Sequence, residues 1–141
     1  MLSKQRVNLG LNMFPHFFGA WSSVSKDLCD DLITFFENHP ELHRSGKIAG
    51  GKIDHDIKKS TDIRVDPLDL ESPQYEIFNR YFTVLNKCYQ DYCDQWNFLN
   101  TFISKIHIGS FNLQKYLPGE HFSGIHAERT SLTHLHRILV W

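Results

Sequence analysis

The sequence has few cysteines, no long apolar run and no motif that directs secretion. Its three cysteines include no CxxC pair, which argues against a disulfide framework or a four-cysteine zinc site and favours a reducing compartment. No stretch approaches the ~18 apolar residues of a membrane span, and the N-terminus lacks the uninterrupted apolar core of a signal peptide. We therefore expect a cytoplasmic protein with no membrane partner.

The chain also lacks a surplus of one charge. Fifteen Lys and Arg residues face sixteen Asp and Glu residues, so no strong field is available to attract nucleic acid. Its 141 residues, 41% of them hydrophobic, are enough for one domain with a buried core. Histidine, by contrast, is frequent: five of the nine copies fall in the last third of the chain. Histidine is the commonest metal ligand, so candidate chemistry is sought there.

The first part of the chain shows helical periodicity. Apolar residues at three- and four-residue steps predict a helix over 25–38, with Ser25 as its cap, and a longer helix over 73–96 that starts at Ser72-Pro73. Between them, a polar loop is expected over 41–60 and a strand over 61–65. The lysines at 58 and 59 are expected on a solvated surface.

The last part of the chain shows the period of two that is typical of strands. Strands are predicted over 102–108, 111–116 and 137–141, with an extended piece over 122–128 and a turn at Pro118-Gly119. Two helices followed by a run of strands indicate an α+β fold. Because the chain stops inside an apolar strand, we expect it to be the N-terminal portion of a longer, C-terminally truncated protein.

The tripeptide His126-Ala127-Glu128 is the main chemical candidate. In an extended chain residues i and i+2 point to the same side, so this imidazole and this carboxylate can converge on one point. One imidazole and one carboxylate are two of the three ligands in the facial triad that holds non-haem Fe(II). The competing interpretation is ordinary surface polarity.

The sequence around this tripeptide resembles that of the iron(II)/2-oxoglutarate-dependent oxygenases, and in particular that of their prolyl 4-hydroxylase-like group. In that group a strand ending in Tyr leads through Gly and an aromatic residue into His-x-Asp, and a strand beginning with Arg follows. The matching positions here are Tyr116, Gly119, Phe122, His126-Ala127-Glu128 and Arg137-Ile138-Leu139-Val140-Trp141. Cys29 near the start of the first helix and Lys59-Ser60-Thr61-Asp62 also look similar to the family.

The resemblance implies a double-stranded β-helix (jelly-roll) core, only partly present, with two N-terminal helices packed on one sheet. Residues 1–141 would then be one domain, with a helical lead-in over 1–100 and jelly-roll strands over 101–141. It implies Fe(II) on His126 and Glu128, 2-oxoglutarate hydrogen-bonded by Tyr116, and substrate contact by Arg129. The implied reaction is hydroxylation of a C–H bond with O2, giving succinate and CO2, with ascorbate dependence and a peptidyl proline or another molecule as substrate.

Two departures from the family pattern keep alternatives open. The carboxylate is Glu128 rather than the commoner Asp. The family's second metal-binding His and its basic residue for 2-oxoglutarate would fall after Trp141, which leaves open the activity of the 141-residue chain. One alternative is therefore a non-catalytic metal-binding or interaction remnant of the fold. Another is a cupin-type metalloprotein that uses His134 and His136.

Overall fold

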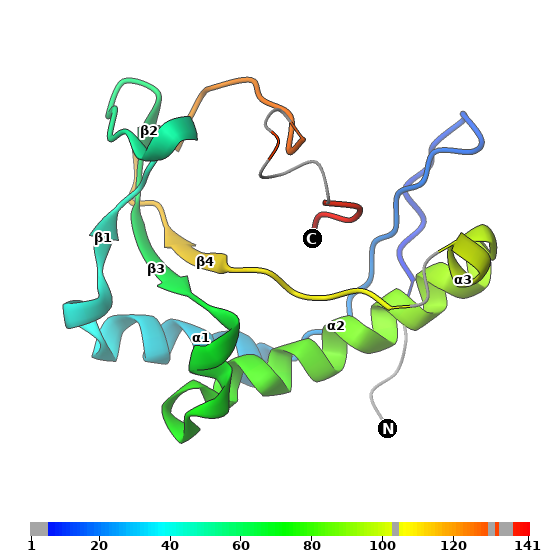
Figure 1. The fold of residues 1–141 in the computed structure, drawn as a ribbon, viewed down its shortest axis with the longest axis horizontal. Coiled ribbons are helices and arrows are strands. Elements are labelled where there is room, and N and C mark those ends of the chain that lie inside the picture. Colours follow the sequence, from blue (N-terminus) through cyan, green and yellow to red (C-terminus); the bar gives the residue numbers. More distant parts are fainter. Residues whose placement is uncertain (1–5, 103–104, 130–131, 133–136) are drawn as a thin grey trace. The chain divides into compact units, whose positions relative to one another are not determined.

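The computed structural model describes residues 6–102, 105–129, 132 and 137–141 (Figure 1). The chain divides into two compact units. One comprises Met1–Leu42 and Arg64–Leu113, and the other comprises His43–Ile63 and Gln114–Trp141.

Two amphipathic helices form most of the first unit. Helix α1 spans Lys26–Asn38 and begins where the Ser25 hydroxyl accepts a hydrogen bond from the Leu28 N–H at 3.2 Å. Helix α2 spans Glu76–Gln95, so the helices predicted over 25–38 and 73–96 are confirmed. A 3₁₀ turn, η4 (Pro73–Tyr75), forms the beginning of the longer one.

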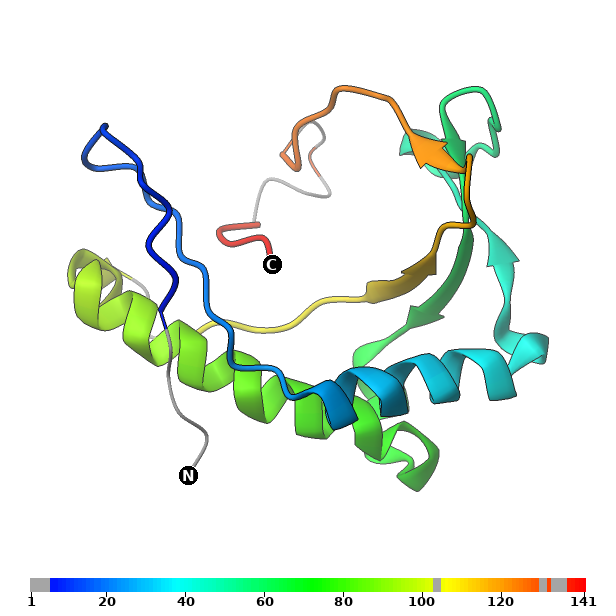
Figure 2. The same ribbon diagram turned by 180° about the vertical axis from the view of Figure 1, so that it is seen from behind.

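The helices α1 and α2 lie side by side (Figures 1 and 2). Phe35 of α1 and Phe78 of α2 are both buried, with ring centroids 5.0 Å apart in an edge-to-face arrangement. At the other end of α2, Trp96 is 5% exposed and packs against the rings of Phe14 and Phe17. Burial of these apolar faces explains why the 3.6-residue period dominates this part of the sequence.

Two small antiparallel sheets supply the β-structure. In one, β1 (Arg44–Ser45), β3 (Thr61–Val65) and β4 (Phe111–Lys115) occur in the order β1-β3-β4, and Arg44 lies opposite Asp62. In the other, β2 (Lys58–Lys59) pairs with β5 (His121–Phe122), which Figure 2 shows in orange. The strands predicted over 61–65 and 111–116 are thus confirmed, and so is the α+β class.

The predicted turn between β4 and β5 is also present. The Glu120 N–H donates to the Leu117 carbonyl at 2.8 Å, and Gly119 has a φ of 85°. Such a positive φ is disfavoured for residues with a Cβ, which is why Pro-Gly marks the turn. The turn places β5 shortly after β4 along the chain.

Two strand predictions are wrong for the described residues. Phe102 ends a short helix, α3 (Phe98–Phe102), while 105–108 and 137–141 have no regular structure. The extended piece predicted over 122–128 begins in β5 with Phe122. Leu99, three residues after Trp96, is buried with it, so packing at helical spacing outweighs the β propensity of this stretch. The polar loop expected over 41–60 contains β1, β2 and two 3₁₀ turns, η1 (Pro40–Leu42), which ends in it, and η2 (Ala49–Gly51).

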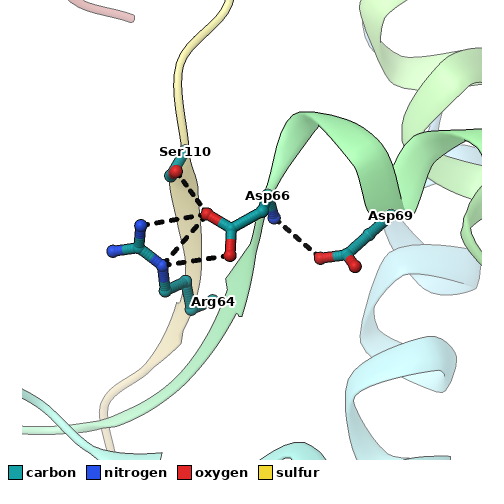
Figure 3. A network of polar contacts seen from close by, with 4 residues as sticks. All are labelled: Arg64, Asp66, Asp69 and Ser110. Atoms are coloured by element: carbon teal, nitrogen blue, oxygen red, sulfur yellow. Dashed lines mark hydrogen bonds and ion pairs between the residues drawn. The ribbon is translucent and has the colours of Figure 1, made fainter.

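A cluster of polar side chains lies at the end of β3, where the chain has returned to the first unit (Figure 3). The Asp66 carboxylate accepts hydrogen bonds from the Ser110 hydroxyl and from the Arg64 guanidinium, the latter at 2.9 Å. Both hydrogen bonds lower the pKa of Asp66, the one from Ser110 having the larger effect, and together they outweigh desolvation, which raises it. The Asp66 N–H in turn donates to the Asp69 carboxylate at 2.8 Å, which starts the 3₁₀ turn η3 (Pro67–Glu71).

Within the described residues, no helix has both the length and the apolar character needed to cross a membrane.

Candidate functional site

His126 and Glu128 lie close together in the irregular segment that follows β5. The His126 Nε2 and Glu128 Oε1 atoms are 3.4 Å apart, and the two side chains are 50% and 36% exposed. The structure therefore brings together the imidazole and the carboxylate that the sequence singled out. Both are accessible to a small ligand from solvent.

The orientation of the His126 ring is set by the backbone. Its Nδ1 is 3.0 Å from the Gly124 carbonyl oxygen, which can only accept, so Nδ1 carries a proton. In the neutral ring the lone pair is then on Nε2 and faces the carboxylate. A positive charge, either a proton on Nε2 or a metal ion, can be shared by the two atoms at this distance. A hydrogen bond from the second ring nitrogen to a carbonyl is typical of histidines that bind metals.

Glu128 is held on its other oxygen. Its Oε2 forms an ion pair with the guanidinium of Arg137, which leaves Oε1 facing His126. Arginine keeps its charge at any accessible pH, so Oε2 faces a fixed positive charge. The partner of Glu128 within the described residues is thus Arg137 rather than its sequence neighbour Arg129, which is exposed.

The spacing of the two ligand atoms suits a metal ion. Bonds of about 2.1 Å from an ion to an imidazole nitrogen and to a carboxylate oxygen would together exceed 3.4 Å, so one ion can touch both atoms. Among the described residues there is no group of three or more His, Cys, Asp or Glu side chains able to hold a metal. This part of the chain thus offers two ligands, and a metal bound here would take further ligands from elsewhere.

A buried polar network lies in the same unit, and sequence reasoning missed it. Lys58, Ser60 and Asp62 are only 4%, 6% and 6% exposed. The Asp62 carboxylate accepts hydrogen bonds from Lys58 Nζ at 2.9 Å, Ser60 Oγ at 2.7 Å and Gln114 Nε2 at 2.9 Å. Lys58 was expected on a solvated surface, whereas only its neighbour Lys59 is exposed. The two-residue spacing of these three polar side chains, which puts them on one face of the chain, was the available signal.

Phe122 connects this network to the His126–Glu128 pair. In the β2–β5 pairing it lies opposite Lys58, whose Nζ is 5.6 Å from the centroid of its ring. The same ring stacks on the imidazole of His126, with centroids 4.7 Å apart and planes inclined by 24°. A continuous set of contacts therefore runs from a buried ion pair to the candidate ligands.

The remaining residues of interest are Tyr116, His121, His134 and His136. Tyr116 follows β4, is 39% exposed, and forms no hydrogen bond with the described part of the chain. His121 lies in β5, is exposed, and has its Nε2 3.1 Å from the Asp56 carbonyl oxygen. His134 and His136, the ligands of the cupin alternative, lie outside the described residues.

Comparison of the chain with protein-family models, with curated proteins and with solved structures finds no match. The residues of this chain and their geometry therefore carry the functional proposal. The resemblance to the oxygenases, carried mainly by residues 114–141, stays a prediction.

Proposed function

We propose that the chain is part of an Fe(II)/2-oxoglutarate-dependent oxygenase of the prolyl 4-hydroxylase-like group, with iron on His126 and Glu128. The observation that carries the proposal is the 3.4 Å approach of His126 Nε2 to Glu128 Oε1, with the imidazole proton fixed on the other nitrogen. The two small antiparallel sheets would be the beginning of a double-stranded β-helix. The proposed setting is the cytoplasm.

The residues present would act mainly by binding and orienting. Nε2 of His126 and Oε1 of Glu128 would each donate a lone pair, while the Gly124 carbonyl keeps the Nδ1 proton in place. Bound Fe(II) would supply the O2 chemistry that inserts one oxygen atom into a C–H bond of the substrate as 2-oxoglutarate is oxidised to succinate and CO2. The Tyr116 hydroxyl would donate a hydrogen bond to 2-oxoglutarate, and Arg129 would contact the substrate. Peptidyl proline is the proposed substrate class, and ascorbate is the proposed reductant that maintains Fe(II).

The direct test is an anaerobic titration with Fe(II), with and without 2-oxoglutarate, followed by visible absorption. A weak charge-transfer band should appear only when both are present, and it should be absent in His126→Ala and in Glu128→Ala. His121→Ala is the matched control, because this histidine is exposed and bonds to the Asp56 carbonyl instead. Absence of the band in the wild-type chain, or its retention in His126→Ala, would contradict the proposal.

A second candidate, a non-catalytic metal-binding remnant, is favoured by the finding of only two suitable ligands among the described residues. It differs from the first in one measurable respect. A remnant would bind metal through His126 without converting 2-oxoglutarate to succinate. Formation of succinate after exposure to O2 would exclude the remnant, and loss of binding in His134→Ala but not in His126→Ala would instead favour the cupin alternative.

A further inference from the structure

The ligand pair at His126 and Glu128 is not positioned by regular secondary structure. Both residues lie after β5, beyond the Ser123 N–H that donates to the Ile57 carbonyl at 2.8 Å and continues the pairing with the β2 side. A metal site requires its ligands to be held close to the binding geometry before the ion arrives, or the ordering costs affinity. Two side chains that cannot bind a metal through a lone pair, Phe122 and Arg137, lie against this pair.

Phe122 restrains the imidazole through a ring that is itself anchored. The ring stacks on His126 with a 4.7 Å centroid distance, and strand pairing places Phe122 opposite Lys58. The Lys58 ammonium lies 5.6 Å from the ring centroid and is buried, and it is fixed by Asp62 at 2.9 Å. A cation at this distance from an aromatic ring is attracted to it, so the ring is held by the buried network.

Arg137 restrains the carboxylate. Its guanidinium occupies Oε2 of Glu128 and leaves Oε1, 3.4 Å from His126, available. The contact runs through one guanidinium nitrogen, Nη1, of a permanently charged group, and it lies on the oxygen that does not face His126. The carboxylate is thereby oriented to bind through a single oxygen.

We propose that Phe122 and Arg137 are positioning residues of the metal site: Phe122 fixes the plane of the His126 imidazole, and Arg137 fixes which oxygen of Glu128 faces it. The proposal rests on the proposed function, since it assumes a metal on His126 and Glu128. It makes the affinity of the site depend on two residues that do not touch the ion. Loss of such outer contacts typically lowers metal affinity by about 10- to 100-fold.

The test uses Co(II), which reports its ligand set through visible absorption, added to the full chain without O2, with affinity measured by calorimetry. Arg137→Gln and Phe122→Leu should each bind Co(II) about 10- to 100-fold more weakly and alter its visible spectrum. Arg137→Lys should recover part of the affinity. Arg80→Gln is the matched control, because it removes an arginine–carboxylate pair, Arg80–Asp31, in the other unit, and it should bind Co(II) like the wild type.

The outcomes separate this inference from the proposed function. Wild-type affinity and spectrum in Arg137→Gln and Phe122→Leu, together with lost binding in His126→Ala, would overturn the positioning roles and leave the metal site standing. Absence of Co(II) binding in the wild-type chain would overturn both. Far-UV circular dichroism checks that each variant is folded. If Arg137→Gln is not folded, Arg137→Lys decides, since wild-type affinity in that variant would refute the role of the guanidinium.

Discussion

Replacing Asp62 with asparagine would leave a buried ammonium without its counter-ion. The side chains of Lys58 and Asp62 are 5% and 9% exposed, and their charged atoms are 2.9 Å apart. Removing one partner of such a pair costs about 3–5 kcal/mol, because the remaining charge stays desolvated and unpaired. Asparagine preserves the shape of the side chain and an oxygen for the Ser60 hydroxyl, but its amide nitrogen replaces the oxygen that accepts from Lys58 and Gln114, so the loss includes these two hydrogen bonds as well as the charge.

Replacing Lys58 with methionine should cost less than replacing Asp62. The Asp62 carboxylate would keep two hydrogen bonds, from Ser60 at 2.7 Å and from Gln114 at 2.9 Å, that partly replace the lost ammonium. The double variant Lys58→Met/Asp62→Asn should be destabilised by less than the sum of the single losses, because it leaves no unpaired charge. The difference from additivity measures the coupling between the two groups.

The assay is urea unfolding followed by far-UV circular dichroism, with amide hydrogen exchange at β3 to localise the effect. Gly46, whose N–H donates to the Ser60 carbonyl at 2.9 Å, provides a second amide probe beside the network. A loss of about 3–5 kcal/mol would be a large fraction of the 5–15 kcal/mol typical of folded domains. If Asp62→Asn stays within about 1 kcal/mol of the wild type, as expected for an exposed pair, the pair is solvated and the reasoning is refuted.

Three further predictions concern the first unit. Trp96→Ala should lose about 3–5 kcal/mol in urea unfolding, because the indole is 5% exposed; a change below about 1 kcal/mol would contradict its place in the core. The lowered pKa of Asp66 means that its ion pair stabilises the fold above pH 3.8, the ordinary value, and that this stabilisation is lost as the pH falls through the lower folded pKa. The stability difference between the wild type and Asp66→Asn should therefore shrink in acid, whereas a constant difference from pH 7 to pH 2 would refute it. Burial and a hydrogen bond with Cys93 raise the pKa of Tyr89 to about 12, so its contribution to stability should be complete below pH 10 and lost between pH 10 and about 12. The pKa values of Tyr75, Tyr81 and Tyr92 are also raised, so ultraviolet absorbance titration should show a late phase whose amplitude falls in Tyr89→Phe, and an unchanged late phase would contradict this.

Local sequence chemistry predicted the elements that carry their own signals. The cap at Ser25 and the apolar steps through Phe35 and Phe36 were sufficient for α1, and the alternation of 61–65 was sufficient for β3. Pro118-Gly119 predicted its turn because the φ of 85° at Gly119 suits a residue without a Cβ. The strand predicted over 102–108 was wrong because an alternating pattern of apolar residues does not show which other residues the segment packs against.

For the candidate site, the sequence determined which side chains are available, and spacing of two residues placed His126 and Glu128 on one side of the chain. Tertiary structure decided what holds them. Arg137, nine residues along the chain, takes the second oxygen of Glu128, and pairing of β2 with β5 brings Phe122 over the buried Lys58. Tertiary structure also decided that Lys58 is buried while Lys59 is exposed. The charge of a buried lysine needs a paired acceptor, and for Lys58 this acceptor is Asp62. The pairing of β2 with β5 joins segments that are distant along the chain, which no local pattern encodes.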